Sequence, residues 1–122
     1  MIEETQKIMR LPDLHVNATA VRVPVLYGHS ESVYIELNNT PPSVEEVYQN
    51  LFDFPGIKVY TNSYPMPMVQ SGDDLVHIGR LRRDLSNPNA FSFWIVADNI
   101  RKGAATNALQ IAEYLVEKNW IK

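Results

Sequence analysis

An arginine and a histidine in the segment 22–37 are the side chains best suited to chemistry. Arg22 lies in an otherwise apolar run, where its planar guanidinium could bind a carboxylate through two hydrogen bonds. Burying an unpaired guanidinium costs on the order of several kcal/mol, so the alternative is that Arg22 reaches solvent at a strand edge. His29 follows a glycine in a polar turn, where an imidazole can serve as acid or base near neutral pH. A lone histidine in a loop is also typical of an ordinary surface.

These two residues can share a site only if the chain bends between them. A straight strand rises ~3.3 Å per residue and alternates faces, which would put Arg22 and His29 ~23 Å apart on opposite faces. Pro24 cannot donate a hydrogen bond to a neighbouring strand, and Gly28 can adopt a positive φ. Pro24 and Gly28 are therefore the expected bend points.

Two further groups of polar side chains could bind a ligand. Asp98 and Asn99 are both available as N-caps of the last helix. Asn99 is best interpreted as a cap, although a helix N-terminus also suits a polar ligand. Arg80, Arg82 and Arg83 cluster on one predicted strand and suggest an anion patch. Basic residues on a strand are more often solvated or paired across an interface, so the patch alone predicts no site.

The composition excludes several classes of function. The 11 Lys and Arg residues against 14 Asp and Glu give a formal charge of -3, so no basic field exists to hold a nucleic acid. There is no cysteine, which excludes disulfides, thiolate zinc sites and a cysteine nucleophile within the chain. Neither glycine-rich nucleotide loops nor the H-E-x-x-H motif occurs, and no metal site is predicted. The remaining histidines, His15 and His77, are expected to be structural.

The length of 122 residues predicts a single domain spanning 1–122. With 45% apolar and 20% charged residues, the chain resembles ordinary folded proteins rather than disordered ones. No apolar run approaches the ~18–20 residues of a membrane span, and the N-terminus lacks the pattern of a signal peptide. We expect a soluble, cytoplasmic protein with no membrane partner.

The first half of the chain predicts two helices and three strands. Residues 3–10 are good helix formers that end at Leu11-Pro12-Asp13, and residues 43–52 form an amphipathic helix opened by a Ser43-x-x-Glu46 capping box. Strands are predicted at 16–23, 32–37 and 57–60 from β-branched or alternating residues. Residues 61–74 contain two prolines and several turn formers, which indicates an irregular excursion.

The second half predicts a hairpin and a long helix. Strands at 75–83 and 90–97 are joined across residues 84–89, and a helix from about 100 to 118 is expected to cover one face of the sheet. The resulting fold class is α+β, with a mixed or antiparallel sheet and helices on one face. Strand 90–97 is apolar on both faces, so we expect it to be central, with another domain or subunit covering the second face.

Several long strings carry a resemblance to a known family. They are ETQKIMR (4–10), VNATAVRV (16–23), RVPVLYGHSESVYIEL (22–37), RLRRD (80–84) and FWIVADNIRKGAATNALQIAE (93–113). Together they resemble the C-terminal half of bacterial aspartate-semialdehyde dehydrogenases. The resemblance covers nearly the whole chain and is weakest over 38–74.

The resemblance implies a domain related to the C-terminal domain of glyceraldehyde-3-phosphate dehydrogenase. In this family an N-terminal Rossmann domain binds NADP, and a second domain, inserted before the last helix, bears much of the substrate site and the subunit interface. The enzymes interconvert L-aspartyl-4-phosphate and L-aspartate 4-semialdehyde, on the way to lysine, methionine and threonine. The partners it implies are this small substrate and a second subunit, in a homodimer or a dimer of dimers.

The resemblance also implies roles for three residues. The family's substrate-carboxylate arginine falls on Arg22, its acid/base histidine falls on His29, and an asparagine that contacts the nicotinamide end of NADP falls on Asn99. The family's catalytic cysteine, active-site glutamine and glycine-rich dinucleotide loop have no counterpart in this sequence. Its substrate-binding Glu and Lys are expected just upstream of Met1, so no residue of helix 3–10 takes those roles.

The first hypothesis is that the chain is the substrate and dimerisation domain of such an enzyme, recorded as a truncation or split product and inactive by itself. The alternative is a freestanding, non-catalytic homologue that pairs with full-length subunits or binds a metabolite. A related aldehyde dehydrogenase acting on another acyl phosphate fits the quoted strings poorly.

Overall fold

Four strands form one mixed sheet in the computed structural model, which describes residues 1–121. The strands are β1 (His29–Glu36), β2 (Ile57–Tyr60), β3 (Val76–Arg83) and β4 (Ala90–Ala97), in the order β1-β4-β3-β2. β4 pairs antiparallel with both β1 and β3, while β2 pairs parallel with β3. The predicted α+β class with a mixed sheet is confirmed, and so is the central position of strand 90–97.

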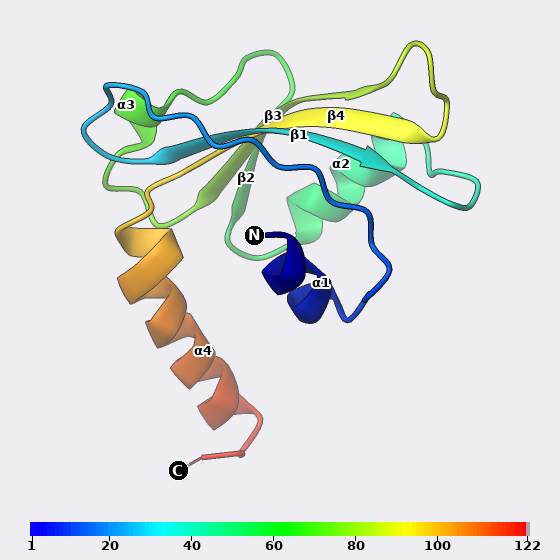
Figure 1. Cartoon of the computed structure of the whole chain (residues 1–122). Helices are drawn as coiled ribbons and strands as arrows, with labels where there is room; N and C mark the ends of the chain where they lie inside the picture. The colour runs from blue at the N-terminus through cyan, green and yellow to red at the C-terminus, as the bar shows by residue number, and fades with distance from the viewer. Residues whose placement is uncertain (122) are drawn as a thin grey trace.

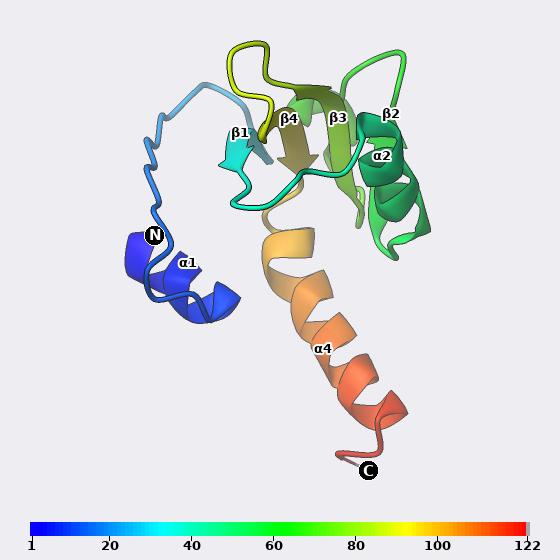
Figure 2. The same ribbon diagram turned by 90° about the vertical axis from the view of Figure 1, so that its right-hand side faces the viewer.

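The helices of the first half lie at different distances from this sheet. α1 (Ile2–Met9) stands apart from it at the N-terminus, whereas α2 (Val44–Asp53) packs against β2 and β3 (Figures 1 and 2). The predicted capping box opens α2. The Ser43 side chain accepts from the Glu46 amide at 3.1 Å, and the Glu46 carboxylate accepts from the Ser43 amide at 2.7 Å.

The prediction of a strand at residues 16–23 is wrong. This segment has no regular structure and arcs outside the sheet, with Val21 and Val23 exposed (Figure 2). β-branched residues form a strand only where a neighbouring strand offers backbone hydrogen bonds, and among the described residues this segment has no such neighbour. The irregular segment 61–74 is confirmed except for one short turn of helix, α3 (Pro67–Gln70).

The last helix forms as predicted but does not cover the sheet. A π-helical turn, η1 (Arg101–Ala105), leads into α4 (Thr106–Glu117), which runs away from the sheet in both views (Figures 1 and 2). Its apolar residues Leu109 and Val116 are more than half exposed. The apolar stripe of α4 therefore finds no partner within residues 1–121, although its periodicity is that of a packed helix.

The small core is built mainly from the sheet, and the loop 61–66 crosses over it. Pro65 and Tyr64 cross over Gly79, where an added Cβ would lie 2.8 Å from Pro65 Cδ. The Trp94 indole donates to the Pro65 carbonyl at 3.0 Å. The fully or nearly buried side chains include Pro65, His77, Ile78, Leu81, Ala90, Phe91, Val96 and Asp98.

Candidate functional site

His29 enters the sheet at the end where β4 stops. It is the first residue of β1 and pairs with Ala97, the last residue of β4. The chain before it reverses direction close to α3, and the Val25 amide donates to the Val23 carbonyl at 2.9 Å, so the predicted bend around Pro24 is present (Figure 1). The His29 side chain is exposed, as a residue that exchanges protons with a ligand must be.

Gly28 fixes the direction in which the chain enters β1. Its φ is 97°, a left-handed conformation that side chains disfavour. A Cβ at this position would lie 3.4 Å from the Ala97 carbonyl oxygen and 3.5 Å from Pro67 Cβ. The predicted positive φ at Gly28 is therefore confirmed, and the end of β4 and the start of α3 enclose this glycine.

Asn99 joins the same corner from a position 71 residues along the chain. Its Oδ1 accepts a hydrogen bond from the Gly28 amide at 2.9 Å. His29 and Asn99 are thus brought together through Gly28. Of the two predicted N-caps, Asp98 takes the capping role and Asn99 does not.

Asp98 is buried and organises the start of the helix. One carboxylate oxygen accepts from the amides of Ile100 and Arg101, at 2.9 and 3.2 Å, and the other accepts from the Gly72 amide at 2.8 Å. These hydrogen bonds, the one from Gly72 first, lower the pKa of Asp98 below its ordinary value. The carboxylate therefore stays charged at neutral pH and ties the 71–72 loop to the helix that follows β4.

A second carboxylate strengthens this junction. Asp74 accepts from Arg101 Nε at 2.7 Å and from a terminal guanidinium nitrogen at 2.8 Å, and it also accepts from the Thr106 hydroxyl. The Arg101 hydrogen bonds, followed by that of Thr106, lower the pKa of Asp74 to about 2. Residues 71–75 and the η1–α4 helix are thus joined at two points.

Arg22 is exposed in the irregular segment before the bend. Within residues 1–121 it makes no ion pair, so a carboxylate from outside could reach its guanidinium. No hydrogen bond in the same region joins Arg22 to His29 or Asn99. The structure leaves Arg22 available for a ligand but does not fix it against the other two residues.

The arginine patch on β3 divides into different environments. Arg83 donates to the carbonyls of Pro42 and Pro88 and lies over the Phe91 ring at 4.6 Å, which makes it a structural clamp. Arg80 lies over the Tyr64 ring at 5.9 Å, and Arg82 donates to the Arg80 carbonyl at 2.8 Å. Arg80 and Arg82 line an open hollow with Tyr48 and the loop 61–64.

His77 is buried in the sheet, in agreement with the structural role expected for it. Its Nδ1 lies 3.1 Å from the Tyr60 hydroxyl, and its Nε2 lies 3.2 Å from an Asp73 carboxylate oxygen in poor alignment for a hydrogen bond. Burial lowers the pKa of His77, and the Asp73 carboxylate opposes this shift. Its neutral form therefore suits the core.

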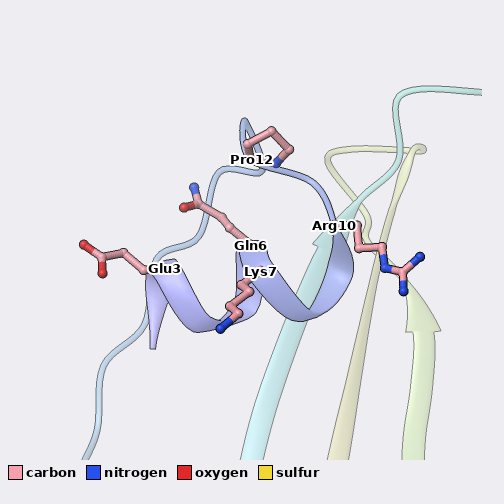
Figure 3. A pocket seen from close by; sticks show the side chains of 5 residues that line it. All are labelled: Glu3, Gln6, Lys7, Arg10 and Pro12. Carbon is pink, nitrogen blue, oxygen red and sulfur yellow. The ribbon is translucent and has the colours of Figure 1, made fainter.

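Neither a metal site nor a membrane span is found in the part of the chain that the structure describes. There, no three His, Asp or Glu side chains converge on one point, and no helix is long and apolar enough to cross a bilayer. A further hollow lies along α1, lined by Glu3, Gln6, Lys7, Arg10 and Pro12, with Arg10 directed away from Glu3 (Figure 3). None of the candidate site residues lines this hollow.

Comparison with known proteins identifies the family. Residues 1–102 match the family described as the dimerisation domain of semialdehyde dehydrogenases. The chain belongs to this family. The predicted resemblance is confirmed, and the family description itself names a dimerisation domain.

The similar proteins of known activity are named as aspartate-semialdehyde dehydrogenases. The aspartate-semialdehyde dehydrogenase of Bacillus subtilis is 46% identical over 99% of this chain, and that of Legionella pneumophila is 49% identical over all of it. The chain spans only 36% of the length of each relative.

Solved structures of the family share this fold. The aspartate semialdehyde dehydrogenase II of Vibrio cholerae, in complex with ASA, superposes with a TM-score of 0.89 and 46% identity, over 96% of this chain and 35% of that one. The Candida albicans enzyme with NADP gives a TM-score of 0.69 and 31% identity, over 82% of this chain and 33% of that one. The implied likeness to the C-terminal domain of glyceraldehyde-3-phosphate dehydrogenase holds for the fold.

Proposed function

We propose that this chain forms the substrate-binding and dimerisation part of an NADP-dependent aspartate-semialdehyde dehydrogenase. The reaction would convert L-aspartyl-4-phosphate and NADPH to L-aspartate 4-semialdehyde, NADP and phosphate. The observation that carries the proposal is the superposition on the Vibrio cholerae enzyme, which covers 96% of this chain at 46% identity. The proposed setting is amino-acid biosynthesis in the cytoplasm.

The residues of this chain would bind the substrate and move protons. Arg22, exposed and without an ion pair in the described residues, suits the α-carboxylate of the substrate because its guanidinium can donate two parallel hydrogen bonds. His29, exposed at the start of β1, suits proton transfer to and from the reacting groups. The thiol nucleophile must come from elsewhere, since the chain has no cysteine.

NADP would supply the hydride chemistry of this reaction. The chain has no glycine-rich loop to hold the pyrophosphate, so it would contact only the nicotinamide end of the cofactor, through Asn99. The amide of Asn99 fits that role, because its Oδ1 is engaged with Gly28 while its amino group has no partner within residues 1–121.

We further propose that residues 1–122 do not act as one isolated domain. The family match ends at residue 102, and α4 extends beyond it with exposed apolar residues. The relatives are about three times longer than the matched segment, so a further part of the enzyme would cover α4. The dimer would form through residues 1–102, which the family model matches, and two dimers would pair in a higher assembly.

A chimaera tests this function directly. This chain replaces the matching third of the Vibrio cholerae enzyme, and phosphate-dependent oxidation of the semialdehyde by NADP is measured. We expect turnover, a kcat lower by ~10²–10⁴ in His29→Asn, and no loss in the control His15→Asn, an exposed histidine. Arg22→Lys should lower kcat/KM for the semialdehyde, because lysine keeps the charge but loses the planar fork. An inactive chimaera with normal folding contradicts the proposed function.

A further inference from the structure

The hydrogen bond between Asn99 and Gly28 links the start of the last helix to the loop that carries His29. The two residues are 71 positions apart, and the Asn99 Oδ1 to Gly28 nitrogen distance is 2.9 Å. Gly28 lies beside Ala97 and Pro67 and directly precedes His29. A hydrogen bond to its amide therefore restrains the backbone at the point where the chain enters β1. Asn99 therefore holds the backbone from which the histidine projects.

The orientation of the Asn99 amide follows from its partner. A backbone N–H can only donate, so the atom that faces Gly28 must be the oxygen. The amino group then points elsewhere and can only donate. Within residues 1–121 it has no hydrogen-bond acceptor, which leaves both of its N–H groups for a ligand.

Asn99 is itself held in place on both sides. Asp98 anchors the backbone through the amides of Gly72, Ile100 and Arg101. The Asp98 carbonyl accepts from the Lys102 amide at 2.9 Å, as the first hydrogen bond of the helix. The Asn99 side chain is thus presented from a rigid helix start rather than from a loose loop.

We infer that Asn99 is a positioning residue for His29, acting through its hydrogen bond to the Gly28 amide. The inference rests on the proposed function. The two roles of Asn99 would use different atoms of one side chain: Oδ1 orients the His29 loop, while Nδ2 is left for the nicotinamide contact given to Asn99 in the proposed function. A substitution that keeps one atom and removes the other separates them.

Three variants make this separation. Asn99→Ala removes both polar atoms of the side chain. Asn99→Asp keeps an oxygen acceptor for the Gly28 amide but removes the N–H donors. Asn107→Asp, on the exposed surface of α4, is the control for the added negative charge. Hydrogen exchange of the Gly28 amide is measured in this chain without any ligand. We expect exchange to accelerate by roughly tenfold or more in Asn99→Ala, and to stay near the parent rate in Asn99→Asp and Asn107→Asp.

The same variants, placed in the chimaera, test the effect of Asn99 on catalysis and on NADP binding. Asn99→Ala should lower kcat by about tenfold and raise KM for NADP, while Asn99→Asp should restore most of kcat and leave KM for NADP high. The kcat against pH profile should keep its shape in Asn107→Asp.

Two results overturn the inference. One is Gly28 exchange that is unchanged in Asn99→Ala, which shows that the hydrogen bond does not hold the loop. The other is a kcat as low in Asn99→Asp as in Asn99→Ala, which assigns the loss to the missing donor. If Asn99→Ala does not fold, Asn99→Leu, which is close to Asn in size but lacks both polar atoms, replaces it in both measurements. A parent chimaera without turnover contradicts the proposed function instead, while the exchange measurement still decides the Asn99–Gly28 contact.

Discussion

The position of His29, the candidate acid/base residue, depends on the backbone conformation of one neighbouring glycine. Gly28 has a φ of 97°, which a residue with a side chain adopts only with strain, and a Cβ there would touch Ala97 and Pro67 at ordinary contact distance. The sequence places His29 in a polar turn, but the structure makes it the first residue of β1, because Gly28 turns the chain into the sheet beside the end of β4. The candidate proton-transfer role of His29 thus depends on Gly28, a residue that has no side chain.

Gly28→Ala should lower both stability and activity. A left-handed conformation forced on alanine costs about 1–3 kcal/mol of unfolding free energy, and relief of that strain would turn His29 away. Gly56→Ala is the matched control, because Gly56 has a φ of 79° but lies in the turn before β2. Urea unfolding should show similar losses in both variants, whereas the chimaera should lose kcat only in Gly28→Ala. Equal kcat in the two would contradict the role of Gly28 in placing His29.

At the level of elements, carboxylates join the segments around the site. Asp98 connects the end of β4 to the loop after α3, and Asp74 connects residues 71–75 to the η1–α4 helix. α4 makes few contacts of its own with the sheet, so these polar junctions determine its direction. The helix that carries Asn99 at its start is thus oriented mainly by electrostatics and hydrogen bonds.

The Asp74 junction should weaken in acid. The Asp74 carboxyl has a pKa of about 2 in the folded chain against an ordinary value of 3.8. Because the folded-state pKa is lowered, the stabilisation is complete above pH ~4 and is lost as the pH falls through about 2. Asp74→Asn should lower stability at pH 6 and remove this part of the pH dependence between pH 4 and 2.

Circular dichroism melts of the parent and Asp74→Asn between pH 2 and 6 measure this difference. Asp53→Asn is the control, since Asp53 accepts a hydrogen bond from Gln49 at 3.1 Å but forms no ion pair within residues 1–121. A constant difference between parent and Asp74→Asn over the whole range would show that Asp74 stabilises the chain without its charge.

At the scale of the whole molecule, the chain exposes more surface than a compact monomer. Its accessible area is 9716 Å², whereas a folded monomer of 13.9 kDa is expected to expose about 6,700 Å². The excess of roughly 3,000 Å² exceeds the ~800 Å² that each partner buries in a typical interface. It includes the apolar stripe of α4 and the outer strand β1, so there is room for both a second subunit and a further domain.

The isolated chain should therefore self-associate but show no dehydrogenase turnover. Association is expected because it buries exposed apolar surface. No turnover is expected because the chain has neither a cysteine nucleophile nor a glycine-rich dinucleotide loop. Sedimentation velocity at micromolar concentration should show a dimer in the parent and a monomer in Ile35→Glu, which places a charge on β1. Leu85→Glu, at a fully exposed turn position, is the control.

A strictly monomeric parent would place the dimer surface outside this chain. NADP-dependent turnover by the isolated chain would contradict the assignment of the nucleophile and the cofactor loop to another part of the enzyme.

Local signals in the sequence were sufficient for most of the elements. The capping box at Ser43, the apolar run of strand 90–97 and the periodicity of the last helix each depend on neighbours within a few residues, and each predicted element forms. The family resemblance was also present in the sequence, because the strings around Arg22, His29 and Asn99 are long.

Only the tertiary structure decided how these pieces meet. The β-branched run 16–23 stays irregular because a strand needs a partner, and propensity does not report whether one exists. The apolar stripe of α4 predicts that this helix face is buried, but not which surface covers it. The Asn99–Gly28 hydrogen bond spans 71 residues, and no local pattern encodes a contact at that separation. Residue types and short-range periodicity are properties of the sequence, whereas pairing, burial and the placing of His29 depend on long-range contacts that only the folded chain makes.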